Sequence, residues 1–271
     1  MPVRQQGERL IWQRRDRRGA LIHWAWMFGF AVVLLASWQV ISERTIWDFV
    51  LDAPSQGADL VSRMFPPDFA YVNALWRPLW DTINMATLGT LIAIALAVPL
   101  AFLAARNTTP RFPLVRPLAL LIIVTSRSIN SLIWALLLVL ILGPGVLAGV
   151  IAIALRSVGF IGKLLYEAIE EIDRRPVEAI TATGATAAQL RVYGVVPQVM
   201  PAFAGISVYR WDINIREATI LGLVGAGGLG LELIASVNTL AWGRVATLFL
   251  LILGTVLISE WISARLRAAV T

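Results

Sequence analysis

The chain alternates between long apolar runs and short polar segments. Six apolar runs fall at 20–41, 81–105, 117–142, 146–170, 198–222 and 244–264. Each is close to the ~20 residues that a helix needs to cross a hydrocarbon core of ~30 Å. The third run is interrupted by polar residues at 126–130, so it forms either one span or a short helix followed by a longer one. The fifth run carries several charges, which leaves five spans as the alternative to six. The pattern predicts an all-α integral membrane protein with about six transmembrane helices.

Basic residues gather on alternate sides of these runs. Arginines precede the first run, follow the second and the fourth, and end the chain, whereas the opposite segments hold few. By the positive-inside rule both termini are cytoplasmic, which requires an even number of spans and favours six. The chain then divides into a basic cytoplasmic segment at 1–19 and a transmembrane domain at 20–271. That domain has a long outer segment at 42–80 and a cytoplasmic loop at 171–197. We expect a multi-pass protein of the cell membrane.

Composition removes several classes of function. Hydrophobic residues make up 58% and charged residues 15% of the chain, against about a quarter charged in an average soluble domain. The net charge of +6 follows the membrane topology, so we expect no nucleic-acid partner. Without cysteine, a thiolate metal site and a disulfide are excluded. The single histidine, His23, lies among tryptophans at the start of the first run and suits the membrane interface. We expect no catalytic residue, no metal and no cofactor bound by this chain.

Charged residues inside the fifth run require an explanation. Insertion of one charge at mid-bilayer costs ~2.5–3.5 kcal/mol, so such groups face a bundle interior or a wet cavity and find partners. Asp212 and Arg216 are four residues apart and can pair on one helix face. Arg210 and Arg127 have no partner of this kind in their own spans; Glu217, Glu232 or a substrate are the candidates for Arg210. The arginines either line a path for a small anion, which a guanidinium binds in bidentate fashion, or form structural ion pairs. The predicted anion pathway comprises Arg127, Arg210, Asp212, Asn214, Arg216 and Glu217.

A glycine-rich stretch follows the fifth run. Its spacing, G-x-G-x-x-G, matches the dinucleotide fingerprint, but that motif requires a preceding strand and an acidic residue about 20 residues on. Here it follows a membrane span at the expected outer end. A turn that allows close backbone approach, or that bends as a gate, fits better. The predicted outer gate comprises Gly225, Gly227, Gly228 and Gly230.

The polar stretch EAITATGATAAQLRVYGVVP, at 178–197, is compatible with a helix but too polar to span a bilayer. It resembles the EAA loop of binding-protein-dependent ABC importer permeases, which fits a groove on the ATPase. The resemblance implies a helix over 178–191 that is buried against an ATPase, with a glycine that permits close approach. A short amphipathic surface helix is the alternative. The matching residues are Glu178, Ala179, Gly184 and Pro197, and the departures are Ile180, Gly194 and Val196.

Further segments sharpen this resemblance. The stretches 65–69, 99–107, 127–130, 210–217 and 221–230 resemble the permease subunit of phosphonate ABC importers, so the resemblance covers roughly 60–266. It implies a type I importer permease that forms a homodimer, with two ATP-binding subunits on the cytoplasmic side and an extracytoplasmic substrate-binding protein. The implied substrate is phosphonate or a related small oxyanion, phosphate or phosphite.

Two rival functions remain. The sequence holds no Walker A pattern, so ATP would be bound and hydrolysed by partner subunits. An ion-gradient-driven secondary anion transporter could use Asp212, Glu217 or Glu232 as proton carriers, but no internal repeat of the kind common in such proteins is present. A non-transporting membrane scaffold would leave the charges at 210–217 without a use.

Overall fold

The computed structural model describes residues 3–6, 9–12, 17–110 and 112–270. The chain forms two compact units, Met1–Asp59 and Leu60–Thr271. The clusters of buried apolar side chains found among the described residues all lie in the second unit.

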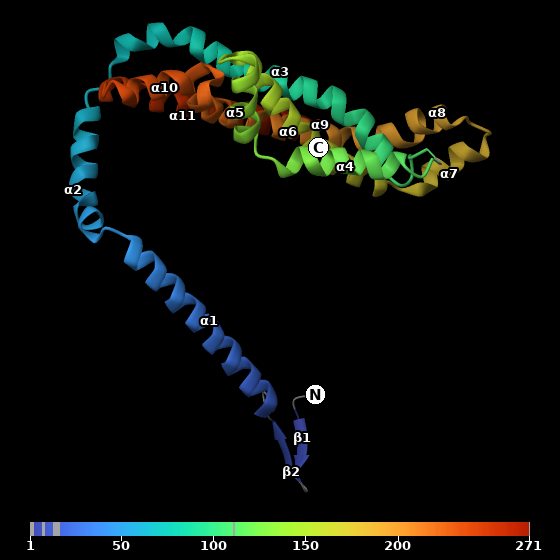
Figure 1. Cartoon of the computed structure of the whole chain (residues 1–271). Helices are drawn as coiled ribbons and strands as arrows, with labels where there is room; N and C mark the ends of the chain where they lie inside the picture. Colours follow the sequence, from blue (N-terminus) through green and yellow to red (C-terminus); the bar gives the residue numbers. More distant parts are fainter. Residues whose placement is uncertain (1–2, 7–8, 13–16, 111, 271) are drawn as a thin grey trace. The chain divides into compact units, whose positions relative to one another are not determined.

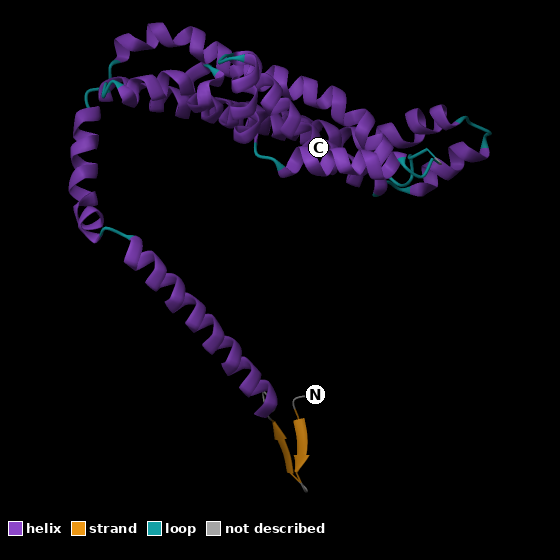
Figure 2. Cartoon of the chain, viewed as in Figure 1, coloured by secondary structure: helices purple, strands orange, loops and turns teal. Residues whose placement is uncertain are grey.

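The first unit holds a β-hairpin and a long apolar helix. Strands β1 (Val3–Gln6) and β2 (Arg9–Trp12) pair antiparallel, with Val3 opposite Trp12. Helix α1 (Arg17–Arg44) follows, and its residues 19–44 are long and apolar enough to cross a membrane. Helix α2 (Trp47–Met64) begins in this unit. The remaining elements of the described residues are helical, which agrees with the all-α prediction apart from this hairpin of two four-residue strands in the basic segment 1–19 (Figure 2).

The second unit is a bundle built around helix α6 (Val146–Glu170), which packs against α3 (Val72–Ala104) and α9 (Val196–Leu221) (Figure 1). Small residues let these helices approach closely, as is common in membrane bundles. A Cβ atom on Gly89 of α3 would lie 2.7 Å from Cγ2 of Ile153 on α6. Ile153 itself is fully buried with Met85 in the largest apolar cluster. Helix α3 begins after the 3-10 turn η1 (Phe69–Tyr71), so the outer segment predicted at 42–80 is helical from Val72 onward.

The interrupted third run forms two helices with a sharp break. Helices α4 (Val115–Ser128) and α5 (Ser131–Leu142) meet at 89° (Figure 1). Asn130 makes the break, because its backbone is extended and its side chain accepts a hydrogen bond from the Leu132 amide at 3.2 Å. Among the described residues five helical segments can cross a membrane, or six if this bent pair is one span. This agrees with the prediction of about six spans.

The loop expected to hold one helix at 178–191 is instead broken in the middle. Helix α7 (Arg174–Ala182) ends before Gly184, and α8 (Ala187–Gln189) with the π-helical segment η2 (Leu190–Val195) follows. Gly184 has φ +77°, and its amide donates to the Thr181 carbonyl at 3.0 Å. A glycine just past the end of a helix adopts this left-handed conformation readily. The single-helix prediction is wrong because it treated Gly184 as a helical residue.

The last part of the chain joins α9 to two further helices. The π-helical segment η3 (Gly222–Ala226) leads into α10 (Gly228–Asn238), and α11 (Trp242–Val270) closes the bundle by packing on α9 and α10.

Candidate functional site

The charged residues of the fifth run lie on α9, and two of them are buried. Arg210 and Asp212 each keep only 2% of their surface exposed. Asp212 pairs with Arg216, which confirms the pair predicted from the four-residue spacing. The same carboxylate accepts a hydrogen bond from Ser259 on α11 at 2.8 Å. Because both carboxylate oxygens have a donor, Asp212 holds α9 against α11.

Arg210 pairs with a carboxylate on its own helix, at a spacing of seven residues. Its Nη2 donates to both carboxylate oxygens of Glu217 at 3.3 Å. Its Nε donates to Ser157 Oγ on α6 at 2.9 Å, and its guanidinium lies 5.1 Å from the ring centre of Phe160. Of the candidate partners, Glu217 is therefore the one observed. The carboxylate of Glu232 instead accepts from the Tyr71 hydroxyl at 2.7 Å.

Arg156 on α6 completes this network and was missed from the sequence. Its Nη1 lies 2.6 Å from Glu217 Oε1 and 3.3 Å from Ser131 Oγ at the start of α5. Glu217 is thus shared by two arginines from different helices. The available signal was a basic residue near the middle of the apolar run 146–170, since a charge at such a depth demands a partner or a function.

Asn214 connects the network to α3. Its fully buried side chain donates to Thr90 Oγ1 at 2.7 Å and to Ser157 Oγ at 3.1 Å. Ser157 also receives the Nε donor of Arg210, so one hydroxyl joins α6 and α9. A buried network of this kind stabilises only when its members are satisfied. The placement of Asn214 therefore supports a structural role for this residue.

Arg127 is set apart from the other members of the predicted pathway. It lies exposed in the last turn of α4, and within the described part of the chain its guanidinium has no hydrogen bond or ion pair. Its neighbour Ser126 is fixed to α6, because Ser126 Oγ accepts from the Gly159 amide at 2.8 Å and donates to the Leu155 carbonyl. The structure does not bring Arg127 into contact with the α9 charges.

The glycine-rich stretch at 225–230 is packed tightly and mostly buried. Gly225, Gly227 and Gly228 have φ values of +92°, +86° and +71°, a region that residues with a Cβ rarely adopt. A Cβ on Gly228 would lie 2.5 Å from Thr82 Oγ1, and one on Gly230 would clash with the Thr219 carbonyl. The motif follows a helix, and the dinucleotide alternative needs a strand there. Close packing therefore requires glycine at 228 and 230, whereas the backbone conformation favours glycine at 225 and 227.

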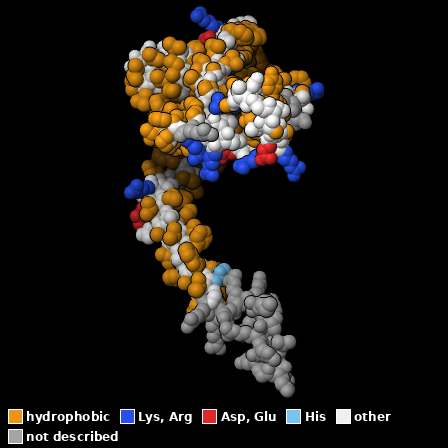
Figure 3. All heavy atoms as spheres, turned by 90° about the vertical axis from the view of Figure 1, so that its right-hand side faces the viewer, with side chains coloured by type: hydrophobic (Ala, Val, Ile, Leu, Met, Phe, Trp, Pro, Cys, Tyr) orange, Lys and Arg blue, Asp and Glu red, His pale blue; other side chains and the backbone are white. Residues whose placement is uncertain are grey.

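The EAA-like residues lie at one end of the second unit, which faces the viewer in Figure 3. Glu178, Ala179, Gly184 and Pro197 are all exposed. Charged side chains gather along the edge of this end (Figure 3). Gly194, which stands where the family pattern has Ile, is buried, and a Cβ there would meet Val177 and Ile180 of α7 at 3.5 Å. The departure from the pattern therefore lets η2 pack on α7.

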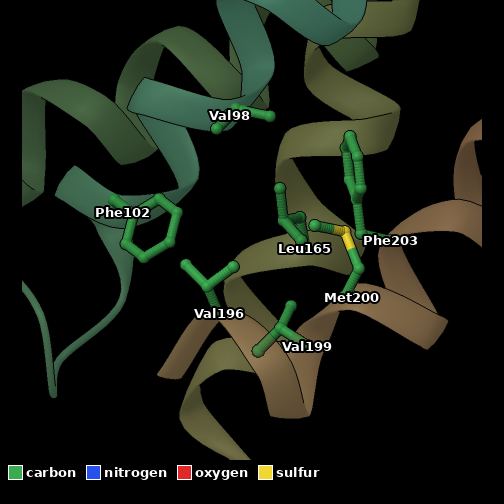
Figure 4. Close-up of a pocket in the computed structure, with 7 residues that line it drawn as sticks. All are labelled: Val98, Phe102, Leu165, Val196, Val199, Met200 and Phe203. Carbon is green, nitrogen blue, oxygen red and sulfur yellow. The ribbon is translucent and has the colours of Figure 1, made fainter. Parts of the chain in front are cut away.

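An apolar pocket of about 110 Å³ opens between α3, α6 and α9 (Figure 4). The side chains around it come from all three helices and carry no hydrogen-bonding group, so the pocket offers nothing to an oxyanion. They are Val98, Phe102, Leu165, Val196, Val199, Met200 and Phe203.

Comparisons with known proteins give a consistent result. Residues 97–271 match the family described as "Binding-protein-dependent transport system inner membrane component". The chain is 42% identical over 239 residues to the phosphite transport system permease protein PtxC of Stutzerimonas stutzeri, covering 88% of this chain and 86% of that protein. It is 41% identical over 224 residues to the phosphate-import permease protein PhnE of Mycolicibacterium smegmatis, covering 81% of this chain and 42% of that protein.

Solved structures agree on the fold. A structure of the inward-facing MetNI methionine ABC transporter superposes with a TM-score of 0.65 at 20% identity, covering 75% of this chain and 99% of the other. The fold is therefore that of a type I ABC importer permease.

Proposed function

The chain belongs to the family of inner membrane components of binding-protein-dependent transport systems, and from this premise we propose that it is the permease subunit of an ATP-driven importer for a small phosphorus oxyanion. Phosphonate, phosphite and phosphate are the members of this substrate class. The observation that carries the proposal is the 42% identity to a phosphite transport permease over 88% of this chain and 86% of that protein. A 37% identical relative over 82% of this chain is also described as a phosphite permease, a putative one from the same organism.

The charges in the bundle support an anionic substrate. Arg127, Arg156 and Arg210 come from three helices, and Glu217 is the one carboxylate paired with any of them among the described residues. These three guanidinium groups thus outnumber the carboxylate that pairs with them, and an unpaired charge costs free energy in a bilayer. A guanidinium binds a tetrahedral oxyanion through two parallel hydrogen bonds, which offsets that cost.

Two features of the chain indicate its partners: it has no Walker A sequence, and it exposes the polar loop at 171–197. Without a Walker A sequence it requires two partner ATPases, and the exposed loop at 171–197 with Glu178, Ala179, Gly184 and Pro197 is the surface proposed to contact them. An extracytoplasmic binding protein delivers the substrate. A second permease copy completes the pore, since one bundle encloses no closed path. Both termini are proposed to be cytoplasmic, which places the glycines at 225–230 at the outer mouth.

Transport energised by ATP distinguishes this proposal from the ion-gradient alternative. The chain is reconstituted in liposomes with its candidate ATPase and binding protein, and uptake of radiolabelled phosphate is measured, with phosphite and methylphosphonate as competitors. We expect uptake that requires ATP and that a proton ionophore does not abolish. Uptake that continues with an ATPase variant lacking its Walker A lysine, and that stops with the ionophore, would refute the proposal.

A further inference from the structure

The break between α4 and α5 is fixed against one turn of α6. Ser126 Oγ accepts from the Gly159 amide at 2.8 Å, and a Cβ on Gly159 would lie only 2.7 Å from the Arg127 backbone nitrogen. On the other side of the break, Arg156 of the same α6 turn reaches Ser131 Oγ at 3.3 Å. The turn at 155–159 therefore holds the end of α4 and the start of α5 together.

Two accessible arginines lie on the elements that form this break. Arg127, in the last turn of α4, is exposed and, among the described residues, has no hydrogen bond or ion pair. The side chain of Arg156 keeps 31% of its surface exposed, whereas that of Arg210 keeps 2%. An arriving anion can therefore reach Arg127 and Arg156, whereas Arg210 is buried.

The start of α5 adds a partial positive charge. This helix runs for 12 residues, and its first turn begins at the break with the Asn130 cap. Asn130 accepts from the amides of Leu132, Ile133 and Trp134, so this end contributes the charge of the helix dipole rather than free donors. Broken membrane helices use such ends to bind anionic groups. Here the helix end lies beside two arginines.

We propose that the α4–α5 break is the substrate site of this permease, in which Arg127 and Arg156 bind the phosphorus oxyanion at the amino end of α5. This inference rests on the proposed function and adds Arg156 and the break to it, while it removes Arg210 from the set of substrate-binding residues.

Glu217 has a defined part in this site. Its carboxylate contacts Arg156 through Oε1 at 2.6 Å and Arg210 through both oxygens at 3.3 Å. When the oxyanion binds, Arg156 exchanges Glu217 for the substrate, and Arg210 keeps Glu217 paired. Arg210 is thus a positioning residue, because it holds the displaced carboxylate inside the bundle without touching the substrate.

Substitution of each arginine tests the site. In the reconstituted complex we expect Arg127→Gln and Arg156→Gln each to lower the initial rate of phosphate uptake per folded complex at least about tenfold. The matched control is Arg77→Gln, which removes another exposed arginine on α3 and should transport normally. In Arg156→Gln the carboxylate of Glu217 stays paired with Arg210 through both oxygens, so this variant should keep most of its thermal stability. Its uptake is therefore compared with that of the wild type at equal amounts of folded complex.

The second readout uses the purified chain without its partners. Inorganic phosphate, at constant ionic strength, should raise the thermal unfolding temperature of the wild-type protein and of Arg77→Gln, but not that of Arg127→Gln or Arg156→Gln. Normal uptake by Arg127→Gln or by Arg156→Gln would overturn the proposed site. If the wild-type complex takes up no phosphate, phosphite or methylphosphonate, the proposed function fails by itself. The thermal shift then decides the site: a shift lost in both variants supports it, and no shift in the wild type refutes it.

Discussion

The close approach of α10 to α9 makes Gly230 intolerant of even one methyl group. A Cβ at this position would clash with the Thr219 carbonyl oxygen and would lie 2.8 Å from Gly222 Cα. Both neighbours are backbone atoms, which cannot rotate away as a side chain can. The variant Gly230→Ala therefore has to separate the two helices at the end of the bundle that holds the glycine-rich turn.

The size of the effect follows from two opposing contributions. Overpacking a tight site costs typically ~1–3 kcal/mol, and a clash with backbone belongs at the upper end. Alanine in a helix gains ~1 kcal/mol over glycine. The net loss is then about 2 kcal/mol, which in a chain of this size corresponds to a fall of roughly 4–8 °C in the unfolding temperature.

Gly254 in α11 provides the matched control, because a Cβ there meets nothing within 4 Å. Gly254→Ala should keep or raise the unfolding temperature, since only the helix-propensity gain applies. Both variants are purified in the same detergent, and unfolding is followed by tryptophan fluorescence at one heating rate. Equal unfolding temperatures for the two variants would contradict the helix approach described for Gly230. If Gly230→Ala also lowers uptake per folded complex, the turn takes part in gating; if not, it serves packing alone.

Two further substitutions test other parts of the structure. Asp212→Asn should lower the unfolding temperature more than Ser259→Ala. The asparagine variant weakens both bonds of a carboxylate whose side chain is 3% exposed, whereas the alanine variant removes only one of them. Equal effects of the two variants would contradict the bridge between α9 and α11. At Gly184, with φ +77°, Gly184→Asn should keep ATPase co-purification and Gly184→Val should lose it, since Asn tolerates the left-handed conformation and a β-branched residue does not. If both variants lose ATPase co-purification, a side chain of any kind at this position blocks close approach to the ATPase.

Local spacing explains which parts of the site could be predicted from the sequence. Asp212 and Arg216 are four residues apart in a run long enough to be helical, so their pairing follows from helix geometry alone. The spans could be predicted for the same reason, since apolar length is a local property. The break at 126–130 was visible as a polar interruption, but its angle of 89° depends on how α6 packs against both helices.

Contacts between distant segments were not predictable. Arg156 and Glu217 are 61 residues apart in sequence, and nothing in either run states that the two helices face each other. The partner of Arg210 is seven residues away, which is two helical turns, so Glu217 could be named as a candidate but could not be chosen over Glu232 or a substrate. At Gly184 the motif match suggested a continuous helix, but the glycine has a positive φ and the helix ends before it.

The unequal exposure of the arginines separates the residues that hold the bundle from those that can bind a substrate. A guanidinium enclosed by Glu217, Ser157 and Phe160, as Arg210 is, already has partners on several sides. Removing it would leave buried acceptors unsatisfied, so its loss reports on folding. Arg127 differs from Arg210, because its guanidinium has no hydrogen bond or ion pair in the described part of the chain. Arg156 lies between these two cases, with one strong contact and an accessible remainder. A residue that exchanges one partner for another during a transport cycle needs both a protein partner and an accessible side chain.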